Sequence, residues 1–374
     1  MKYDFLIVGA GISGCVIAER LANILGKKVL IVDSRDHIGG NCYDYRDENG
    51  IIIHKYGPHV FHTNIEKVWQ YVSQYTKWHL YFHKVLGLVD GIEIPVPFNF
   101  NSLYSVFPPA MAKKYEEKLL ENFPYNSKIS ILKLRKSDDE TLKFLADYIY
   151  EKIFLNYTIK QWELDPNEID PSVTARIPIY LSRDDGYFQD KYQAIPQNGY
   201  TPIFEKMLNH QNIEVRLNTK FQDIKDNIEY DKLVYTGKID EFFDNKHGEL
   251  PYRSLEFALE THELEYYQKV AQHNYPNNFD FTRITEYKHF LNTKSNKTVI
   301  AKEYSYPHIP SKNEAYYPVI QDENRKLYDR YANEAKEMKN IYFTGRLAEY
   351  RYYNMDQTFN SALELFEVIR KEYE

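Results

Sequence analysis

The chain has 374 residues, a length that can bury a large core and is typical of more than one domain. Its formal net charge of −7, with no long basic run, argues against a nucleic-acid-binding protein. The two cysteines suggest neither a disulfide framework nor a zinc site, and no apolar run is long enough to span a membrane. The N-terminus enters a predicted strand at once, without room for a signal peptide, so we expect a cytoplasmic protein.

A strand, a glycine-rich turn, a helix and a second strand are predicted in that order over the first 33 residues. Residues 5–8 are apolar, residues 15–25 form a helical stretch, and residues 29–32 are a second apolar run. The turn before the helix carries G-x-G-x-x-G, formed by Gly9, Gly11 and Gly14. A glycine turn alone is weak evidence, but the elements around it favour a dinucleotide site.

Each residue type in this unit suits a phosphate-bearing ligand. The first glycine permits the tight turn, the second lets the backbone approach a pyrophosphate, and the third lets the helix pack on the strand. Ile12 and Ser13 begin the helix, whose free N–H groups can bind phosphates. Asp33 ends the second strand, where a carboxylate accepts hydrogen bonds from an adenosine ribose, and Ser34 follows it.

Two adjacent glycines follow the second strand, in the sequence DHIGGN at residues 36–41. At Gly39, Gly40 and Asn41 the backbone can pass close to a bulky cofactor, which favours FAD over NAD. An ordinary surface turn is the alternative for this pair of glycines taken alone. A Gly-Pro loop comes next, at residues 56–62.

Strands, a helical bundle and further strands are predicted for the middle of the chain. Residues 80–98 alternate in polarity and contain turn signals, so they predict strands. Residues 101–165 have helical spacing and predict a small bundle. Residues 176–199 are predicted to be loop and strand.

Two later segments, at residues 232–237 and 340–345, resemble each other. Each is a short apolar run that ends in Thr-Gly, as a buried parallel strand does before a ligand-facing turn. A helical stretch at residues 358–373 follows the second segment. We expect this strand, turn and helix to return to the N-terminal sheet, which makes the dinucleotide domain discontinuous.

The predicted fold class is α/β, with a discontinuous Rossmann-like FAD-binding domain, an inserted helical bundle and an antiparallel β-sheet domain. The FAD-binding domain is assigned to residues 1–78, 196–240 and 336–374. The helical bundle, with residues on the substrate side, is assigned to residues 99–172. The antiparallel sheet domain is assigned to residues 79–98, 173–195 and 241–335.

Nearly the whole chain, residues 3–365, resembles the bacterial UDP-galactopyranose mutase family. The glycine motifs are shared by many flavoprotein families. Four segments are more specific to this one: YTIKQW at 157–162, VTARIP at 173–178, FTRITEYKHF at 281–290 and TGRLAEYRYYNMD at 344–356.

The resemblance implies an isomerase that uses FAD without net redox. Such enzymes interconvert UDP-galactopyranose and UDP-galactofuranose, and only the reduced flavin, FADH−, is active. Reduced N5 attacks the anomeric carbon, UDP leaves, and the sugar ring opens as a flavin iminium and recloses. The resemblance also implies a homodimer, an external reductant such as NAD(P)H, and a role in cell-surface polysaccharide biosynthesis.

The resemblance also assigns substrate-side residues. Arg176 and Arg283 match two arginines that contact the pyrophosphate, because a guanidinium pairs with phosphate oxygens in a bidentate manner. With His59 they are the expected catalytic residues, and the apparent loop around Arg176 suggests a lid. The remaining substrate-side matches are Phe154 on the uracil face, Trp162 beside the nucleotide, the tyrosines Tyr157, Tyr187, Tyr317 and Tyr352, and the polar residues Arg253 and Glu303.

Flavin contacts are implied in two further places. The Gly-Pro loop, with His59, Val60 and His62, lies against the isoalloxazine in the family, and His59 is the candidate beside N5. The segment after the last strand supplies Gly345, Arg346, Asn354, Met355 and Asp356. No metal site is suggested.

Three residues depart from the family pattern. Asn354 replaces an aspartate, His83 replaces an asparagine, and Ile153 replaces an aromatic residue, at positions that read the sugar hydroxyls and the base. The same chemistry on UDP-N-acetylgalactosamine or dTDP-fucose is therefore the leading alternative. A flavin amine oxidase or desaturase, and a flavin-binding regulator without activity, fit the charged and tyrosine-rich motifs less well.

Overall fold

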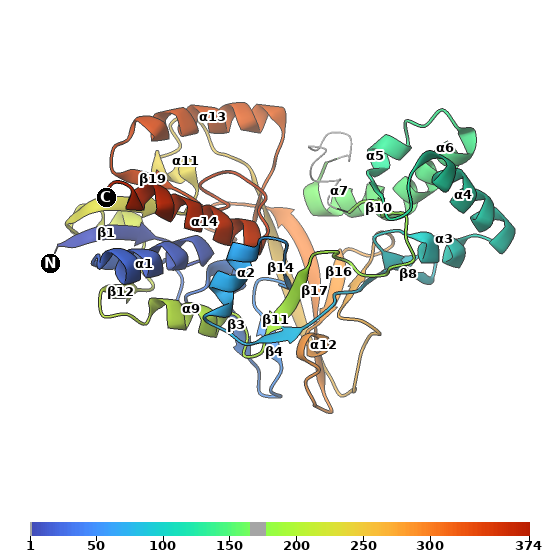
Figure 1. Ribbon diagram of the computed structural model, residues 1–374, viewed down its shortest axis with the longest axis horizontal. Coiled ribbons are helices and arrows are strands. Elements are labelled where there is room, and N and C mark those ends of the chain that lie inside the picture. The colour runs from blue at the N-terminus through green and yellow to red at the C-terminus, as the bar shows by residue number, and fades with distance from the viewer. Residues whose placement is uncertain (1, 165–176) are drawn as a thin grey trace.

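The computed structural model describes residues 2–164 and 177–374 (Figure 1). The molecule is elongated, with a parallel sheet and its helices at one end and a helical bundle at the other. A long antiparallel sheet lies between these two ends. The α/β class with a Rossmann-like unit and an antiparallel sheet, predicted from the sequence, is confirmed.

Three separate stretches of the chain build the five-stranded parallel sheet. Its strand order is β12-β2-β1-β13-β19, and every neighbouring pair is parallel. The strands predicted at residues 232–237 and 340–345 are β13 and β19, so both expectations are confirmed. The strand bounds are Tyr3–Val8 for β1, Val29–Val32 for β2, Ile213–Arg216 for β12, Tyr230–Tyr235 for β13 and Ile341–Phe343 for β19.

Helices cover both faces of this sheet because its side chains alternate and are apolar on both sides. Phe5 and Ile7 point to one face, where they pack under α1, α2, α9 and α14, while Leu6 packs on the other face with α10 and α11. The helices on the first face span Ile12–Leu25 (α1), Glu66–Ser73 (α2), Thr201–Leu208 (α9) and Met355–Arg370 (α14). On the second face, α10 spans Phe221–Ile224, α11 spans Ile239–Phe242 and α13 spans Asp322–Glu337.

The central sheet has seven strands in the order β18-β14-β17-β16-β15-β7-β8. All neighbours are antiparallel except β15 and β7, which are parallel. The strands span Val85–Val89 (β7), Ile92–Val96 (β8), Tyr252–His262 (β14), Gln272–Asn274 (β15), Arg283–Glu286 (β16), Thr298–Pro307 (β17) and Tyr317–Pro318 (β18). The short helix α12, Lys288–Leu291, follows β16.

Short strands connect the larger units. A three-stranded sheet contains Phe61–Thr63 (β5), Tyr192–Pro196 (β11) and Trp78–Leu80 (β6). Two-stranded pairs are formed by Asp44–Arg46 (β3) with Ile52–His54 (β4), and by Lys128–Ile129 (β9) with Ile179–Tyr180 (β10).

The helical bundle has its own apolar core, which includes Leu103, Leu119 and Leu145. A capping box at Asn99 begins its first helix, because the Asn99 side chain accepts from the Ser102 N–H. Its helices span Phe100–Val106 (α3), Pro109–Asn122 (α4), Ile131–Leu134 (α5) and Glu140–Ile149 (α6). A π-helical segment, Tyr150–Leu155, then leads directly into α7, Asn156–Trp162.

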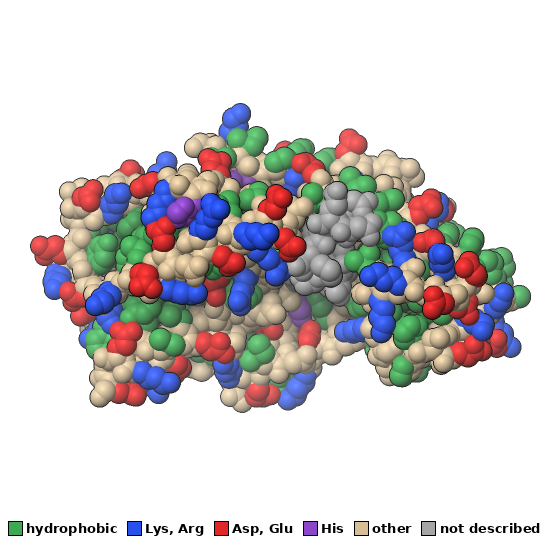
Figure 2. Space-filling view, turned by 90° about the horizontal axis from the view of Figure 1, so that it is seen from above, with side chains coloured by type: hydrophobic (Ala, Val, Ile, Leu, Met, Phe, Trp, Pro, Cys, Tyr) green, Lys and Arg blue, Asp and Glu red, His purple; other side chains and the backbone are tan. Residues whose placement is uncertain are grey.

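The surface is of mixed charge. On the face shown in Figure 2, basic and acidic side chains are interspersed rather than gathered by sign. None of the helices within residues 2–164 and 177–374 combines the length and the apolar character that crossing a bilayer needs.

Gly14 tests how tightly α1 packs on the turn after β1. A Cβ at Gly14 would lie 1.9 Å from the Gly9 carbonyl oxygen, so we expect Gly14→Ala to lower the free energy of unfolding by about 1–3 kcal/mol or more. Urea denaturation measures this loss. Gly26→Ala is the matched control at the other end of α1, where φ is +64° but no described atom lies within 4 Å; only backbone strain of about 1 kcal/mol is expected there. Equal losses in the two variants would contradict the close packing of Gly14.

Candidate functional site

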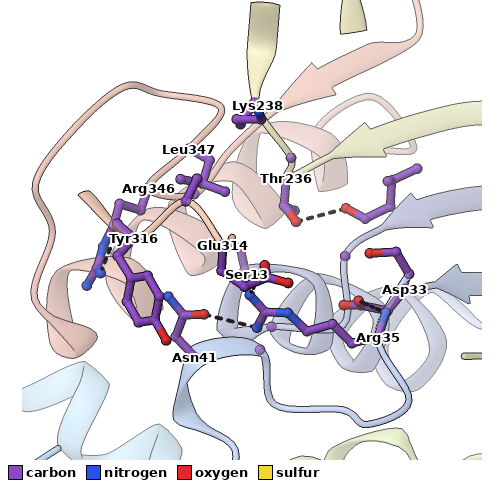
Figure 3. Close-up of a pocket in the computed structure, with 18 of the residues that line it drawn as sticks. Ser13, Asp33, Arg35, Asn41, Thr236, Lys238, Glu314, Tyr316, Arg346 and Leu347 are labelled. Carbon is purple, nitrogen blue, oxygen red and sulfur yellow. Dashed lines mark hydrogen bonds and ion pairs between the residues drawn. The ribbon is translucent and has the colours of Figure 1, made fainter. Parts of the chain in front are cut away.

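A cavity of about 750 Å³ opens at the carboxyl ends of β1, β2 and β13, where an open α/β sheet binds its ligand (Figure 3). Most of the residues predicted to bind a cofactor line it. These are Gly9, Gly11, Ile12, Ser13, Asp33, Ser34, Gly39, Gly40, Asn41, His59, Gly345, Arg346 and Met355.

Backbone forms the floor of this cavity. A Cβ at Gly9, where φ is +103°, would lie 2.1 Å from Thr236 Oγ1, and a Cβ at Gly40 would lie 2.9 Å from the Gly11 Cα. Within the described residues the buried Ser13 hydroxyl has no hydrogen-bond partner. Bare backbone at a helix N-terminus with an unsatisfied hydroxyl fits a diphosphate-bearing dinucleotide.

Asp33 is held in place by the backbone at the rim of the cavity. One carboxylate oxygen accepts from the Ala10 N–H at 2.8 Å and the other from the Arg35 N–H at 2.9 Å. These two bonds orient the carboxylate, and its remaining lone pairs can accept from ligand hydroxyls.

Sequence reasoning missed one group of cavity residues. Arg35 donates to Asn41 Oδ1 at 3.0 Å and to Glu314 Oε2 at 2.8 Å (Figure 3). Its guanidinium also lies 4.5 Å from the centre of the Tyr56 ring. Arg35 could have been found from its place two residues after Asp33. Other lining residues that the sequence did not indicate include Lys238, Glu314 and Tyr316, which come from segments far from the glycine motif. Thr236 belongs to the Thr-Gly turn that was predicted to face a ligand.

The Gly-Pro loop brings one of its two predicted histidines to the cavity. His59 Nδ1 lies 2.7 Å from the Gly57 carbonyl oxygen and must carry the proton, which leaves Nε2 as an acceptor. Burial lowers the pKa of His59 to about 3, so the ring is neutral. The described lining does not include His62, whose Nδ1 lies 2.7 Å from Asp190 Oδ2, or Val60, which packs in the core between the sheets.

An ion pair between the half-buried Arg283 and the buried Glu303 lies at the start of β16. Arg283 Nε donates to Glu303 Oε2 at 2.7 Å, and the Thr282 hydroxyl lies 3.2 Å from the other carboxylate oxygen. Burial by itself lowers the pKa of Arg283, but the Glu303 carboxylate raises it, and the result lies well above the ordinary value. The guanidinium therefore stays charged, and only one of its nitrogens is used by Glu303.

Tyrosines and a tryptophan surround this ion pair. Burial raises the pKa of Tyr157 and of Tyr317, so both hydroxyls keep their protons. The rings of Tyr317 and Tyr352 meet at nearly a right angle with 4.8 Å between centroids, and Trp162 lies 5.7 Å from Tyr352. Arg346 lies 5.2 Å from the Tyr317 ring, so the dinucleotide cavity and this aromatic group are contiguous.

A narrower, mostly apolar cavity of about 70 Å³ lies beside α7 and the π-helical segment. Four residues that the sequence analysis singled out line it: Ile153, Phe154, Tyr157 and Trp162. Asn274 on β15 adds an amide to the wall.

Two residues that were predicted to bind substrate, Arg253 and His83, are buried and contact other side chains or backbone of the protein. Arg253 is buried, donates to the Gln161 carbonyl at 3.0 Å and pairs with Glu163 at 3.0 Å. The His83 ring lies 5.5 Å from that of Tyr187, and burial lowers the pKa of His83 to about 3.

The predicted residues of the C-terminal segment lie around the start of α14. Asn354 caps the helix, and Asp356 accepts from the Thr63 hydroxyl at 2.9 Å. Gly14, from the N-terminal glycine motif, does not line the cavity and packs against Gly9. Arg176 lies outside the described residues. Within the described ranges, His, Cys, Asp and Glu side chains form no group that could hold a metal ion.

Comparison with known proteins gives consistent matches. A family model described as UDP-galactopyranose mutase matches residues 152–352, and one described as an NAD(P)-binding Rossmann-like domain matches residues 7–75. A UDP-galactopyranose mutase from Mycoplasma genitalium is 37% identical over 95% of this chain and 92% of its own. A dTDP-fucopyranose mutase from Escherichia coli is also 37% identical, over 96% of both chains. The crystal structure of a reduced UDP-galactopyranose mutase matches with a TM-score of 0.72 at 16% identity, covering 99% of this chain and 94% of that chain.

The buried histidines generate a pH prediction for stability. The pKa of His54 and of His83 is about 3 in the folded protein, against an ordinary value of 6.5. Between pH 6.5 and pH 3 these histidines are therefore protonated in the unfolded chain but not in the folded protein. The free energy of unfolding should fall as pH drops from 6.5 towards 3, by up to about 1.4 kcal/mol per pH unit for each histidine. Urea denaturation at several pH values measures the slope. His83→Asn should make it shallower, and an unchanged slope would contradict the neutral buried state of His83.

Proposed function

Because this chain belongs to the UDP-galactopyranose mutase family, we propose that it interconverts UDP-galactopyranose and UDP-galactofuranose on a bound, reduced FAD with no net redox change. The observation that supports this most directly is Arg283, a charged and half-buried guanidinium among tyrosines, next to a dinucleotide cavity. A guanidinium in this setting suits the diphosphate of a nucleotide sugar.

The residues of the large cavity would hold the FAD. The glycine turn and the N-terminus of α1 would take its pyrophosphate, Asp33 its adenosine ribose, and His59 and Arg346 would lie towards its flavin end. When bound, reduced FAD supplies a nucleophilic nitrogen for the anomeric carbon.

The chain's own residues would bind and release the UDP. Arg283 would pair with the diphosphate through the guanidinium nitrogens that Glu303 leaves unused. The neutral hydroxyls of Tyr157 and Tyr317, together with Tyr187 and Tyr352, would donate to its oxygens. Diphosphate held in this way stays close while the sugar ring opens and recloses, so that it can add back.

Further contacts would fix the sugar and the base. Unprotonated His59 Nε2 would accept a hydrogen bond from a sugar hydroxyl. Phe154 and Trp162 would hold the base in the narrow cavity. The VTARIP segment would bring Arg176 as a second diphosphate ligand.

A specific observation favours a second candidate substrate, dTDP-fucose. The Escherichia coli relative named dTDP-fucopyranose mutase is as similar to this chain as the Mycoplasma genitalium enzyme is. Asn354 and His83 stand where the galactose enzymes carry aspartate and asparagine, and UDP-N-acetylgalactosamine is a further candidate for the same reason.

The same proposal covers the surroundings of the enzyme. It works in the cytoplasm as a homodimer, takes electrons from an external donor such as NAD(P)H, and supplies furanose sugar for cell-surface polysaccharide. The FAD-binding part comprises residues 1–78, 196–240 and 336–374, and the substrate binds between it, the bundle at 99–172 and the sheet domain at 79–98, 173–195 and 241–335.

Anaerobic turnover of the dithionite-reduced protein tests the proposed function. UDP-galactofuranose, furanose UDP-N-acetylgalactosamine and dTDP-fucofuranose are each offered, and products are separated by chromatography. Conversion to pyranose that stops when the flavin is oxidised supports the mutase, and the fastest sugar identifies the substrate. Flavin reoxidation by an organic substrate, without ring interconversion, would instead indicate an oxidoreductase.

Arg283 variants test the diphosphate site. Arg283→Lys keeps the positive charge but cannot form the bidentate pair, and Arg283→Ala loses both. We expect kcat/KM to fall by about 10-fold to 1000-fold, with the larger loss in Arg283→Ala. Anaerobic initial rates on the preferred sugar measure the effect. Near-normal kcat/KM in both variants would contradict the role of Arg283 in binding the diphosphate.

A further inference from the structure

A lysine ammonium joins helix α7 to the turn between β15 and β16. Lys160 Nζ donates to the carbonyl oxygens of Phe279 and Phe281, each at 3.0 Å, and also to that of Tyr275. An ammonium has three N–H donors, so the turn at residues 275–281 uses all of them. This contact links the helical bundle to the antiparallel sheet at one point.

The turn that Lys160 binds runs directly into the strand that begins with Arg283. On its other side the turn is fixed to β17, because the Thr282 N–H donates to the Glu303 carbonyl at 2.8 Å. Lys160 is therefore one of the contacts that hold α7 near the Arg283–Glu303 pair.

Helix α7 carries two of the proposed substrate contacts next to Lys160 in sequence. Tyr157 lies three residues before it, about one turn of helix, and Trp162 lies two residues after it. Both line the narrow cavity, whose described lining does not include Lys160 itself. A shift of α7 against the turn would therefore move Tyr157 and Trp162 relative to Arg283.

Other hydrogen bonds also hold α7 and the π-helical segment before it. At the start of the helix, Asn156 donates to Asn277 at 2.7 Å in an exposed position, and Asn277 donates to the Lys152 carbonyl at 2.9 Å. At its end, the Gln161 carbonyl accepts from Arg253 at 3.0 Å and from Ser305 at 2.7 Å, which fixes the helix to β14 and β17. Lys160 alone among these side chains binds the turn before Arg283 through three carbonyls.

We propose that Lys160 is a positioning residue for the diphosphate site, whose ammonium seats α7 on the turn at 275–281 so that Tyr157 and Trp162 face Arg283. This inference rests on the proposed function, because it takes the ligand of that site to be a nucleoside diphosphate. Loss of the ammonium leaves three turn carbonyls without their donor and lets the helix and turn separate. Substrate binding then weakens, while the dinucleotide cavity and its cofactor are unaffected.

UDP binding to the flavin-loaded protein, measured by calorimetry, tests this with Lys160→Met. The Kd for UDP and the KM for the sugar nucleotide should rise at least about 10-fold, with kcat within about 3-fold of the unmodified enzyme and flavin content unchanged. Lys152→Met is the matched control. The side chain of that lysine also links the bundle to the sheet, through Asp90 at 3.2 Å, but at the β7–β8 turn. The variant keeps the Lys152 backbone carbonyl that accepts from Asn277, so UDP affinity should not change.

Chemical rescue separates the ammonium from simple packing. Alkylation of Lys160→Cys with 2-bromoethylamine restores an ammonium at almost the same reach. Cys15 and Cys42 are buried, and burial raises the pKa of the Cys42 thiol to about 12 and that of Cys15 as well, so both resist the reagent. The alkylated variant should bind UDP within about 3-fold of the unmodified protein, and the untreated variant should resemble Lys160→Met.

Three outcomes would overturn the inference. They are an unchanged UDP Kd in folded Lys160→Met, a folded Lys160→Cys variant that alkylation does not rescue, and an equal effect of Lys152→Met. If the substituted chains fail to fold, hydrogen exchange of the unmodified protein is measured with and without UDP. UDP should protect the backbone amides of residues 275–281 together with those of α7. Protection of α7 alone would contradict the proposed contact between α7 and this turn. If the unmodified protein binds no UDP, the proposed function itself is wrong. If the unmodified protein binds UDP and only the Lys160 results differ from those expected, the inference about Lys160 alone is wrong.

Discussion

The partly buried ion pair between Arg283 and Glu303 lies where the main parts of the molecule meet, and the candidate site depends on it. Register across β16 and β17 places the two residues opposite each other, so the carboxylate balances the charge of a guanidinium that burial alone would disfavour. Tyr157 from the bundle and Tyr317 from the edge strand β18 surround the pair. Among the described residues Glu303 binds only the Nε of Arg283, so the other guanidinium nitrogens can donate to a diphosphate, and this is the physical reason to expect one there.

The cofactor half of the candidate site, the large cavity, is formed by backbone segments that lie very close together. Gly9 and Gly40 leave no room for a Cβ, so backbone N–H groups rather than side chains face the large cavity. Arg346 borders that cavity and also lies 5.2 Å from the Tyr317 ring. The proposed cofactor and substrate would therefore be neighbours, as chemistry between a flavin and a sugar requires.

Local patterns in the sequence predicted much of the architecture. The strand at 232–237 and its counterpart at 340–345 could be found because an apolar run before Thr-Gly is a short-range signal. Contacts made by distant segments could not be found in this way. Arg35 meets Glu314 from 279 residues away, and the pairing of β5 with β11 turns His62 towards Asp190. The domain bounds and the residue roles remain proposals.

The proposed mutase uses its flavin without consuming it, which can be tested by counting product molecules per reduced flavin. The protein is reduced anaerobically with one equivalent of dithionite per flavin, the excess is removed, and furanose substrate is added without further reductant. We expect many molecules of pyranose product per flavin while the flavin spectrum stays that of the reduced form. One product or fewer per flavin, with the flavin becoming oxidised as product forms, would contradict it.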